Sequence, residues 1–154
     1  MYDICERNEW GDPFSYARSR EIHMSITMQH VINTTYSGAD AIDQQGEAEY
    51  KSTIDKTIKG TYNGISVQPT WEEQELYLIE QKIGKYSNHY FARFDGSKIV
   101  ELYCLTGDEV LGILLPKLKR QYERFQISKP KDPRLGATIT KTEIYRYGKC
   151  IIGQ

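Results

Sequence analysis

Short stretches in which apolar and polar residues alternate, separated by glycine-containing turns, are the clearest pattern along this chain. Two pairs of such stretches each predict a β-hairpin: residues 38–52, with the turn Gln44-Gln45-Gly46, and residues 89–103, with the turn Asp95-Gly96-Ser97. The second strand of the first hairpin is expected to continue to residue 54. Because residues two apart on a strand share a face, Glu49 and Lys51 should project together, with Asp40 brought to the same side.

Three other segments have the composition of helices. Residues 19–34 lack proline and glycine and have partly helical apolar spacing, so they predict a helix. Residues 71–80 predict a second helix, for which Thr70 is the expected N-cap. Residues 108–125 predict a third helix that begins at Asp108 and that Pro116 should kink or split. Basic residues of the third helix, among them Lys117, are expected on its outer side.

The remaining segments have weaker signals. Residues 1–18 have no periodicity and predict an irregular N-terminal arm. Residues 57–68 are polar, aromatic and interrupted by glycine, which favours a loop or irregular strand that faces a partner. A basic loop at residues 128–134 precedes residues 137–147, which we expect to form a strand.

These elements predict one domain over residues 1–154, of mixed α/β (α+β) class, with a mixed central β-sheet flanked by helices. The length of 154 residues and a hydrophobic content of 39% suit a single domain with its own core. No apolar run approaches the roughly 20 residues of a membrane span, and the N-terminus lacks the pattern of a signal peptide. We therefore expect a cytoplasmic protein with no membrane partner. Three widely spaced cysteines suit neither a zinc ribbon nor a disulfide framework.

Charge is unevenly distributed along the chain. The net charge is −1 overall, but residues 1–50 carry −6, residues 51–115 carry −2 and residues 116–154 carry +7. A basic C-terminal quarter on an otherwise acidic chain favours a local surface that faces a polyanion such as DNA. A solvated basic helix would give the same composition.

The first hairpin also carries candidate chemistry. Asp40 and Glu49 could supply carboxylate oxygens to Mg²⁺, which binds oxygen ligands and keeps several waters. Lys51 could then act on an attacking water or on the charge of a phosphate. On its own this pattern is weak, because Glu-x-Lys on a strand is commonly an ordinary surface pair.

The order Asp40…Glu49-x-Lys51 resembles the signature of the PD-(D/E)xK nucleases, and within them the small type II restriction endonucleases. Similar residues follow in the same order over residues 36–152. They are Asp40-Ala41-Ile42-Asp43, Gly46, Glu49-Tyr50-Lys51-Ser52, Lys59-Gly60, Gln68-Pro69, Lys85-Tyr86, Phe91-Ala92, Pro133-Arg134 and Tyr147-Gly148-Lys149.

The resemblance implies a restriction-endonuclease-like core and a homodimer that cleaves both strands of double-stranded DNA at a short palindromic site. It implies Asp40, Glu49 and Lys51 as catalytic residues, with Asp40 and Glu49 as ligands of Mg²⁺, for which Mn²⁺ could substitute. A homing or repair endonuclease of the same fold and a catalytically inactive DNA-binding module are the alternatives.

This chain departs from the family in three ways. Ala39 replaces the proline of the signature, and the spacing from Asp40 to Glu49 is one residue shorter. The base-reading histidines fall on Gly64-Ile65-Ser66, so no recognition sequence is carried over. Asn and Gln suit adenine edges, whereas Lys and Arg suit phosphates or guanine. The DNA-binding candidates here are Lys59, Thr61, Tyr62, Asn63, Ser66, Gln68, Lys129, Lys131, Asp132 and Arg134.

Overall fold

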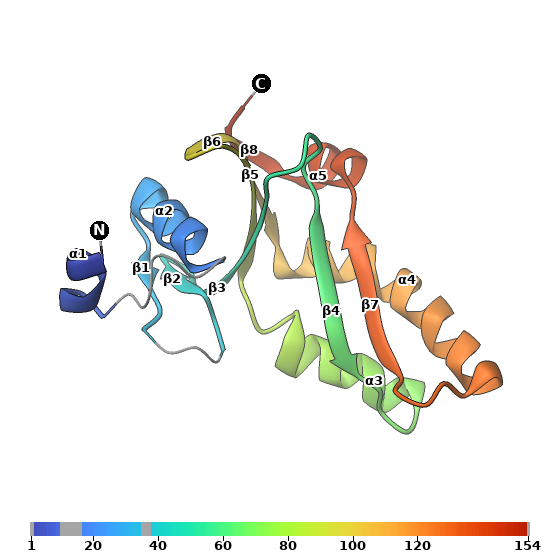
Figure 1. Ribbon diagram of the computed structural model, residues 1–154. Coiled ribbons are helices and arrows are strands. Elements are labelled where there is room, and N and C mark those ends of the chain that lie inside the picture. Colours follow the sequence, from blue (N-terminus) through green and yellow to red (C-terminus); the bar gives the residue numbers. More distant parts are fainter. Residues whose placement is uncertain (1, 10–16, 35–37, 154) are drawn as a thin grey trace.

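A six-stranded mixed β-sheet runs through the computed structural model, which describes residues 2–9, 17–34 and 38–153 (Figure 1). The strands, in their order across the sheet, are β1 (Val31–Ile32), β2 (Ala41–Asp43), β3 (Gly46–Thr53), β5 (Asn88–Asp95), β6 (Lys98–Thr106) and β8 (Lys149–Ile152). β3 and β5 pair in parallel, and the other neighbouring strands pair antiparallel. The expected α/β class with a mixed central sheet is confirmed, as are both hairpins.

Two further strands form a separate ribbon. β4 (Gly60–Ser66) pairs antiparallel with β7 (Arg134–Ile139), and a bulge between Tyr62 and Ile65 interrupts the pairing. Gly64 lies in this bulge with φ of 66°, a left-handed conformation that glycine adopts without steric cost. The segment expected as a loop or irregular strand is therefore an irregular strand. Figure 1 shows the ribbon lying along helix α4 (Gly107–Ser128).

Among the described residues, the two larger hydrophobic cores lie on opposite faces of the sheet. The larger core joins the sheet to α4 and the ribbon, through buried residues such as Phe91, Leu114 and Leu135. The smaller core includes Met24 of α2 (Arg18–Met28) and Tyr50 of β3. The remaining helices are α1 (Tyr2–Arg7), α3 (Trp71–Tyr77), the π-helical turn η1 (Leu78–Lys82) and α5 (Lys141–Tyr147). Within the described residues, no helix is long and apolar enough to cross a membrane.

The N-terminal predictions need two corrections. The helix expected over residues 19–34 ends at Met28, because Gln29 adopts a left-handed conformation with φ of 59° and Val31 then pairs with Ile42. The expected irregular arm contains α1 in its first part. Residues 10–16 of that arm lie outside the described residues.

Helix α4 also differs from expectation. Thr106, not Asp108, is its N-cap, and forms a capping box with Glu109. The helix continues through Pro116 and is not split. Pro116 has no N–H to donate to the carbonyl of Gly112, four residues earlier. Both residues lie on the exposed side of the helix, where water can bond that carbonyl.

The strand expected over residues 137–147 is wrong beyond Ile139. Thr140 ends β7 and forms a capping box with Glu143, which begins α5. This Thr-x-x-Glu signature favours a helix more strongly than the apolar alternation favours a strand. After α5, β8 adds to the main sheet, with Ile152 opposite Leu102.

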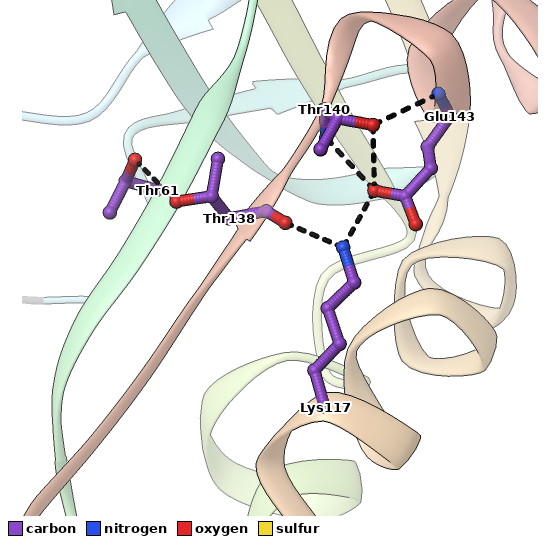
Figure 2. Close-up of polar contacts among 5 residues, drawn as sticks. All are labelled: Thr61, Lys117, Thr138, Thr140 and Glu143. Carbon is purple, nitrogen blue, oxygen red and sulfur yellow. Dashed lines mark hydrogen bonds and ion pairs between the residues drawn. The ribbon is translucent and has the colours of Figure 1, made fainter. Parts of the chain in front are cut away.

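Lys117 ties α4 to the ribbon and to α5, as Figure 2 shows. Its Nζ donates to the carbonyl of Thr138 at 2.8 Å and to Oε1 of Glu143 at 2.7 Å. The same Glu143 oxygen accepts from the backbone N–H of Thr140 at 2.9 Å. Lys117 is therefore a structural residue and not part of the outer basic surface that its position suggested.

Two further side chains of α4 hold the ribbon. Oε1 of Gln121 accepts from the backbone N–H of Gly136 in β7 at 2.8 Å. The hydroxyl of Tyr122 donates to the carbonyl of Gln68, just beyond β4, at 2.9 Å. Contacts from successive turns of one helix thus fix the ribbon along its length.

The start of β4 packs so closely on the sheet that only glycine fits there. A Cβ at Gly60 would lie 2.2 Å from Cε1 of Phe91, whose side chain is fully buried, and 3.4 Å from Cβ of Lys51. We expect Gly60→Ala to lower the free energy of unfolding by about 1–3 kcal/mol through overpacking, measured by urea denaturation.

Gly112→Ala is the matched control. A Cβ at Gly112 meets no atom within 4 Å, and the residue lies inside α4. Alanine there should raise the free energy of unfolding by up to about 1 kcal/mol through helix propensity. Equal stabilities for Gly60→Ala and the wild type would contradict the close packing of β4 on Phe91.

Candidate active site

Asp40 is held at the start of the first hairpin by backbone contacts on both of its sides. It directly precedes β2, and its backbone N–H donates to the carbonyl of Ala48 at 3.1 Å. Its carbonyl accepts from the N–H of Asn33 at 3.0 Å. Its side-chain Oδ2 accepts from the N–H of Tyr50 at 2.8 Å. The carboxyl group is therefore fixed against β3, where the hairpin register predicted it.

Glu49 and Lys51 share one face of β3, as the alternation predicted. Nζ of Lys51 lies 3.4 Å from Oε1 of Glu49, and both side chains are largely but not fully covered. The carboxyl groups of Glu49 and Asp40 are close enough for each to shift the pKa of the other. The structure thus brings together all three of the predicted catalytic side chains.

The two carboxyl groups are held in an environment that disfavours their ionisation. Burial, followed by the charge of Glu49, raises the pKa of Asp40 to about 7. Burial also raises the pKa of Glu49, although Lys51 opposes that rise. A cation placed between the two groups would relieve their repulsion and favour ionisation of both.

A third carboxyl group lies near this pair. Glu21 of α2 has a raised pKa, chiefly through burial and next through the charge of Asp40, and it forms an ion pair with Arg18 at 3.1 Å. The sequence gives no sign of this proximity, because Glu21 reaches the hairpin only when α2 packs against the sheet.

The Lys51 ammonium group lies over the ring of Tyr62, and Tyr62 is in turn held by buried hydrogen bonds. Nζ of Lys51 lies 4.5 Å from the centroid of the Tyr62 ring. The Tyr62 hydroxyl donates to Nδ1 of His89 at 2.8 Å, and Nε2–H of His89 donates to the carbonyl of Ile83 at 3.1 Å. We assign Nδ1 as the acceptor and Nε2–H as the donor because the imidazole is neutral, since burial lowers the pKa of His89 to about 4.

These contacts of Tyr62 correct its prediction as a DNA-binding residue. Tyr62 is buried and its hydroxyl is bonded to His89, so its side chain cannot reach base edges as predicted. His89 is a fully buried residue with both ring nitrogens hydrogen-bonded.

A cleft of about 290 Å³ opens beside Glu49 and Lys51. Glu49 and Lys51 line it together with Asn63 of the ribbon. Its lining also includes Gln81, Lys82 and Lys85, which come from η1 and the turn after it. The sequence did not single out these three residues as site residues, because their position depends on how α3 and η1 fold back onto the sheet.

The other DNA-binding candidates lie on or near the ribbon. Ser66 is exposed opposite Arg134, which forms an ion pair with Asp132 at 3.3 Å. The Thr61 hydroxyl is bonded to that of Thr138 at 3.1 Å, so it is engaged within the ribbon. The remaining candidates are Lys59, paired with Asp55 at 2.7 Å, the half-buried Gln68, and the exposed Lys129 and Lys131.

The carboxylate pair suits Mg²⁺ better than a metal that needs a full cage of protein ligands. Among residues 2–9, 17–34 and 38–153, no group of three or more His, Cys, Asp or Glu side chains is arranged to hold a metal ion. Mg²⁺ is usually bound through one or two carboxylates, with waters and substrate phosphates completing its octahedron. Asp40 and Glu49 fit that mode of binding, and because the ligands must be ionised, the raised pKa of Asp40 would make Mg²⁺ binding depend on pH.

Comparisons with known proteins do not assign this chain to a family. It matches no protein-family model, and no curated protein matches it significantly.

Proposed function

We propose that this protein is a Mg²⁺-dependent endonuclease of the PD-(D/E)xK type that hydrolyses phosphodiester bonds in both strands of double-stranded DNA at a short palindromic site. One observation carries the proposal: Asp40, Glu49 and Lys51 converge at a cleft that Glu49 and Lys51 line, with two interacting carboxyl groups and an ammonium group 3.4 Å from one of them. Burying charged groups together lowers the stability of a fold, and groups with perturbed pKa values are concentrated at functional sites.

Each of the three residues has a distinct role in the proposed reaction. Asp40 and Glu49 would hold the ion, which when bound polarises the phosphate and lowers the pKa of an attacking water. Nζ of Lys51 would donate hydrogen bonds to that water or to a phosphate oxygen and offset developing negative charge. The Tyr62 ring and the neutral His89 behind it hold the ammonium group in place.

The β4–β7 ribbon supports DNA as the substrate. A two-stranded ribbon fits the major groove, where base edges differ most. Its exposed Asn63 and Ser66 are our candidates for base contacts, and Lys129, Lys131 and Arg134 near the α4–β7 turn are candidates for phosphates. Because Asn63 also lines the catalytic cleft, reading and cutting would occur on one stretch of duplex.

A homodimer follows from the proposed palindromic site. Two copies related by a two-fold axis would each place one catalytic cleft on one strand. Restriction of foreign DNA is the biological role that we propose for such an activity.

Digestion of genomic DNA with Mg²⁺, followed by sequencing of the fragment ends, tests this function. We expect one short palindromic sequence at every end and a fixed stagger between the strands. Cleavage at a long asymmetric site would favour a homing or repair enzyme instead. Duplex binding without cleavage under Mg²⁺ or Mn²⁺ would contradict an enzyme and favour a DNA-binding module.

A further inference from the structure

The catalytic cleft has a basic wall, formed by Lys82 and Lys85, that the proposed chemistry does not use. Its charged lining groups are three lysines, Lys51, Lys82 and Lys85, and one glutamate, Glu49. The chain as a whole has a net charge of −1, so the cleft is locally positive on a slightly acidic protein. A cleft of this kind concentrates anions.

This wall is fixed relative to Lys51. The N–H groups of Ile83 and Gly84 donate to the carbonyl of Leu78 at 2.8 and 3.1 Å and close the π-helical turn η1. The carbonyl of Ile83 accepts from His89, which in turn holds the Tyr62 ring beneath the Lys51 ammonium. The basic wall and the catalytic lysine are thus two ends of one buried chain of contacts, and π-helical turns are frequent at functional sites.

Lys82 and Lys85 are exposed and available to a ligand. Their Nζ atoms lie 5.8 Å from the Tyr77 ring centroid and 5.0 Å from the Tyr86 ring centroid, respectively. Within the described part of the chain, neither ammonium group forms an ion pair with a carboxylate. Both ammonium groups are therefore available to an anionic ligand beside the cleft.

We propose that Lys82 and Lys85 bind phosphates next to the scissile phosphate on the cleaved strand, so that the cleft holds a stretch of polynucleotide. The inference rests on the proposed nuclease function, since it names substrate contacts of the same site. An ammonium group is a compact charge suited to phosphate, and its contact releases counterions from DNA. These two lysines bind and position the strand, whereas Lys51 acts on the reacting phosphate.

The test uses Lys82→Gln and Lys85→Gln in the full-length protein, with a duplex carrying the cleavage site. Binding is measured with Ca²⁺ in place of Mg²⁺ over a range of salt concentrations. Each substitution should weaken binding several-fold and lower the slope of log affinity against log salt by about 1. With Mg²⁺, KM should rise while kcat stays unchanged, because these contacts do not depend on the reaction. Lys82→Arg and Lys85→Arg should restore both the affinity and the slope.

Lys98→Gln is the matched control, because Lys98 is exposed at the β5–β6 turn and does not line the cleft. The inference would be overturned if Lys82→Gln and Lys85→Gln had the same affinity and salt slope as Lys98→Gln. A fall in kcat at constant KM in Lys82→Gln or Lys85→Gln would also overturn it. A wild-type protein that binds duplex with the expected slopes but cleaves none would refute the nuclease and retain the basic wall as a DNA contact. Unchanged melting temperatures would show that the variants are folded.

Discussion

Asp40→Asn should abolish cleavage and, at pH 8, make the protein more stable than the wild type. Cleavage is lost because the carboxamide is a poor ligand for Mg²⁺. Stability rises because the substitution removes a buried charge that repels Glu49. The contact with the backbone N–H of Tyr50 survives, since the amide oxygen can accept it in place of Oδ2.

The sign of the pH dependence follows from the raised pKa of Asp40. Its pKa is about 7 in the folded protein, against an ordinary value of 3.8. Stability from the protonated group is therefore fully present below pH 3.8 and is lost as the pH rises through 7. The loss amounts to at most about 4 kcal/mol by pH 8. Asp40→Asn lacks this loss, so the two proteins should have similar stability near pH 4 and differ most above pH 7.

Urea unfolding from pH 4 to pH 8, with and without excess Mg²⁺, measures this effect. Mg²⁺ should stabilise the wild type at pH 8, because it binds only the folded protein, and should not stabilise Asp40→Asn. Asp95→Asn is the control, since Asp95 is exposed at the end of β5. It should change neither cleavage nor the pH profile. An Asp40→Asn variant that is less stable than the wild type at pH 8 would mean that Asp40 is a structural residue.

How much of the fold the sequence predicts depends on how local the determining interactions are. Both hairpins were predicted because their turns carry local signals, as at Asp95-Gly96-Ser97. The strand predicted over residues 137–147 is wrong beyond Ile139, because the capping box of Thr140 and Glu143 lies within an apolar alternation and begins a helix there. The addition of β8 to the sheet depends on the pairing of Ile152 with Leu102, fifty positions apart, for which no local pattern exists.

The same distinction holds for the candidate site. Strand alternation predicted that Glu49 and Lys51 share a face, and the hairpin register brought Asp40 to them. Tyr62 is buried between the more exposed Thr61 and Asn63, as strand alternation predicts. The polar composition of this segment instead suggested a surface loop, so the burial of Tyr62 was not expected. Lys82 reaches the cleft only through the packing of η1, which no spacing in the sequence encodes.

Lys51→Met should lower kcat by at least about 10²-fold while leaving DNA binding close to that of the wild type. Methionine has a similar length and can remain packed on the Tyr62 ring, so the substitution removes the charge and little of the packing. The lost ammonium group is the one nearest Glu49, at 3.4 Å, and its proposed contacts form at the reacting phosphate. A group that acts in the transition state affects kcat, and removing one such donor commonly costs about 10²–10³-fold.

Single-turnover cleavage of a duplex and binding in Ca²⁺ separate this role from that of the basic wall. Lys51→Met should have normal affinity and slow cleavage, whereas Lys82→Gln should have reduced affinity and normal cleavage at saturation. Loss of Lys51 should also raise the pKa of Glu49 further, because the cation that opposes the effect of burial is gone. Cleavage by Lys51→Met should therefore recover partly at higher pH, where Glu49 ionises and can bind Mg²⁺. Lys98→Met is the control, because Lys98 is exposed and does not line the cleft. If Lys51→Met and Lys98→Met both had the kcat of the wild type, Lys51 would have no part in the proposed mechanism.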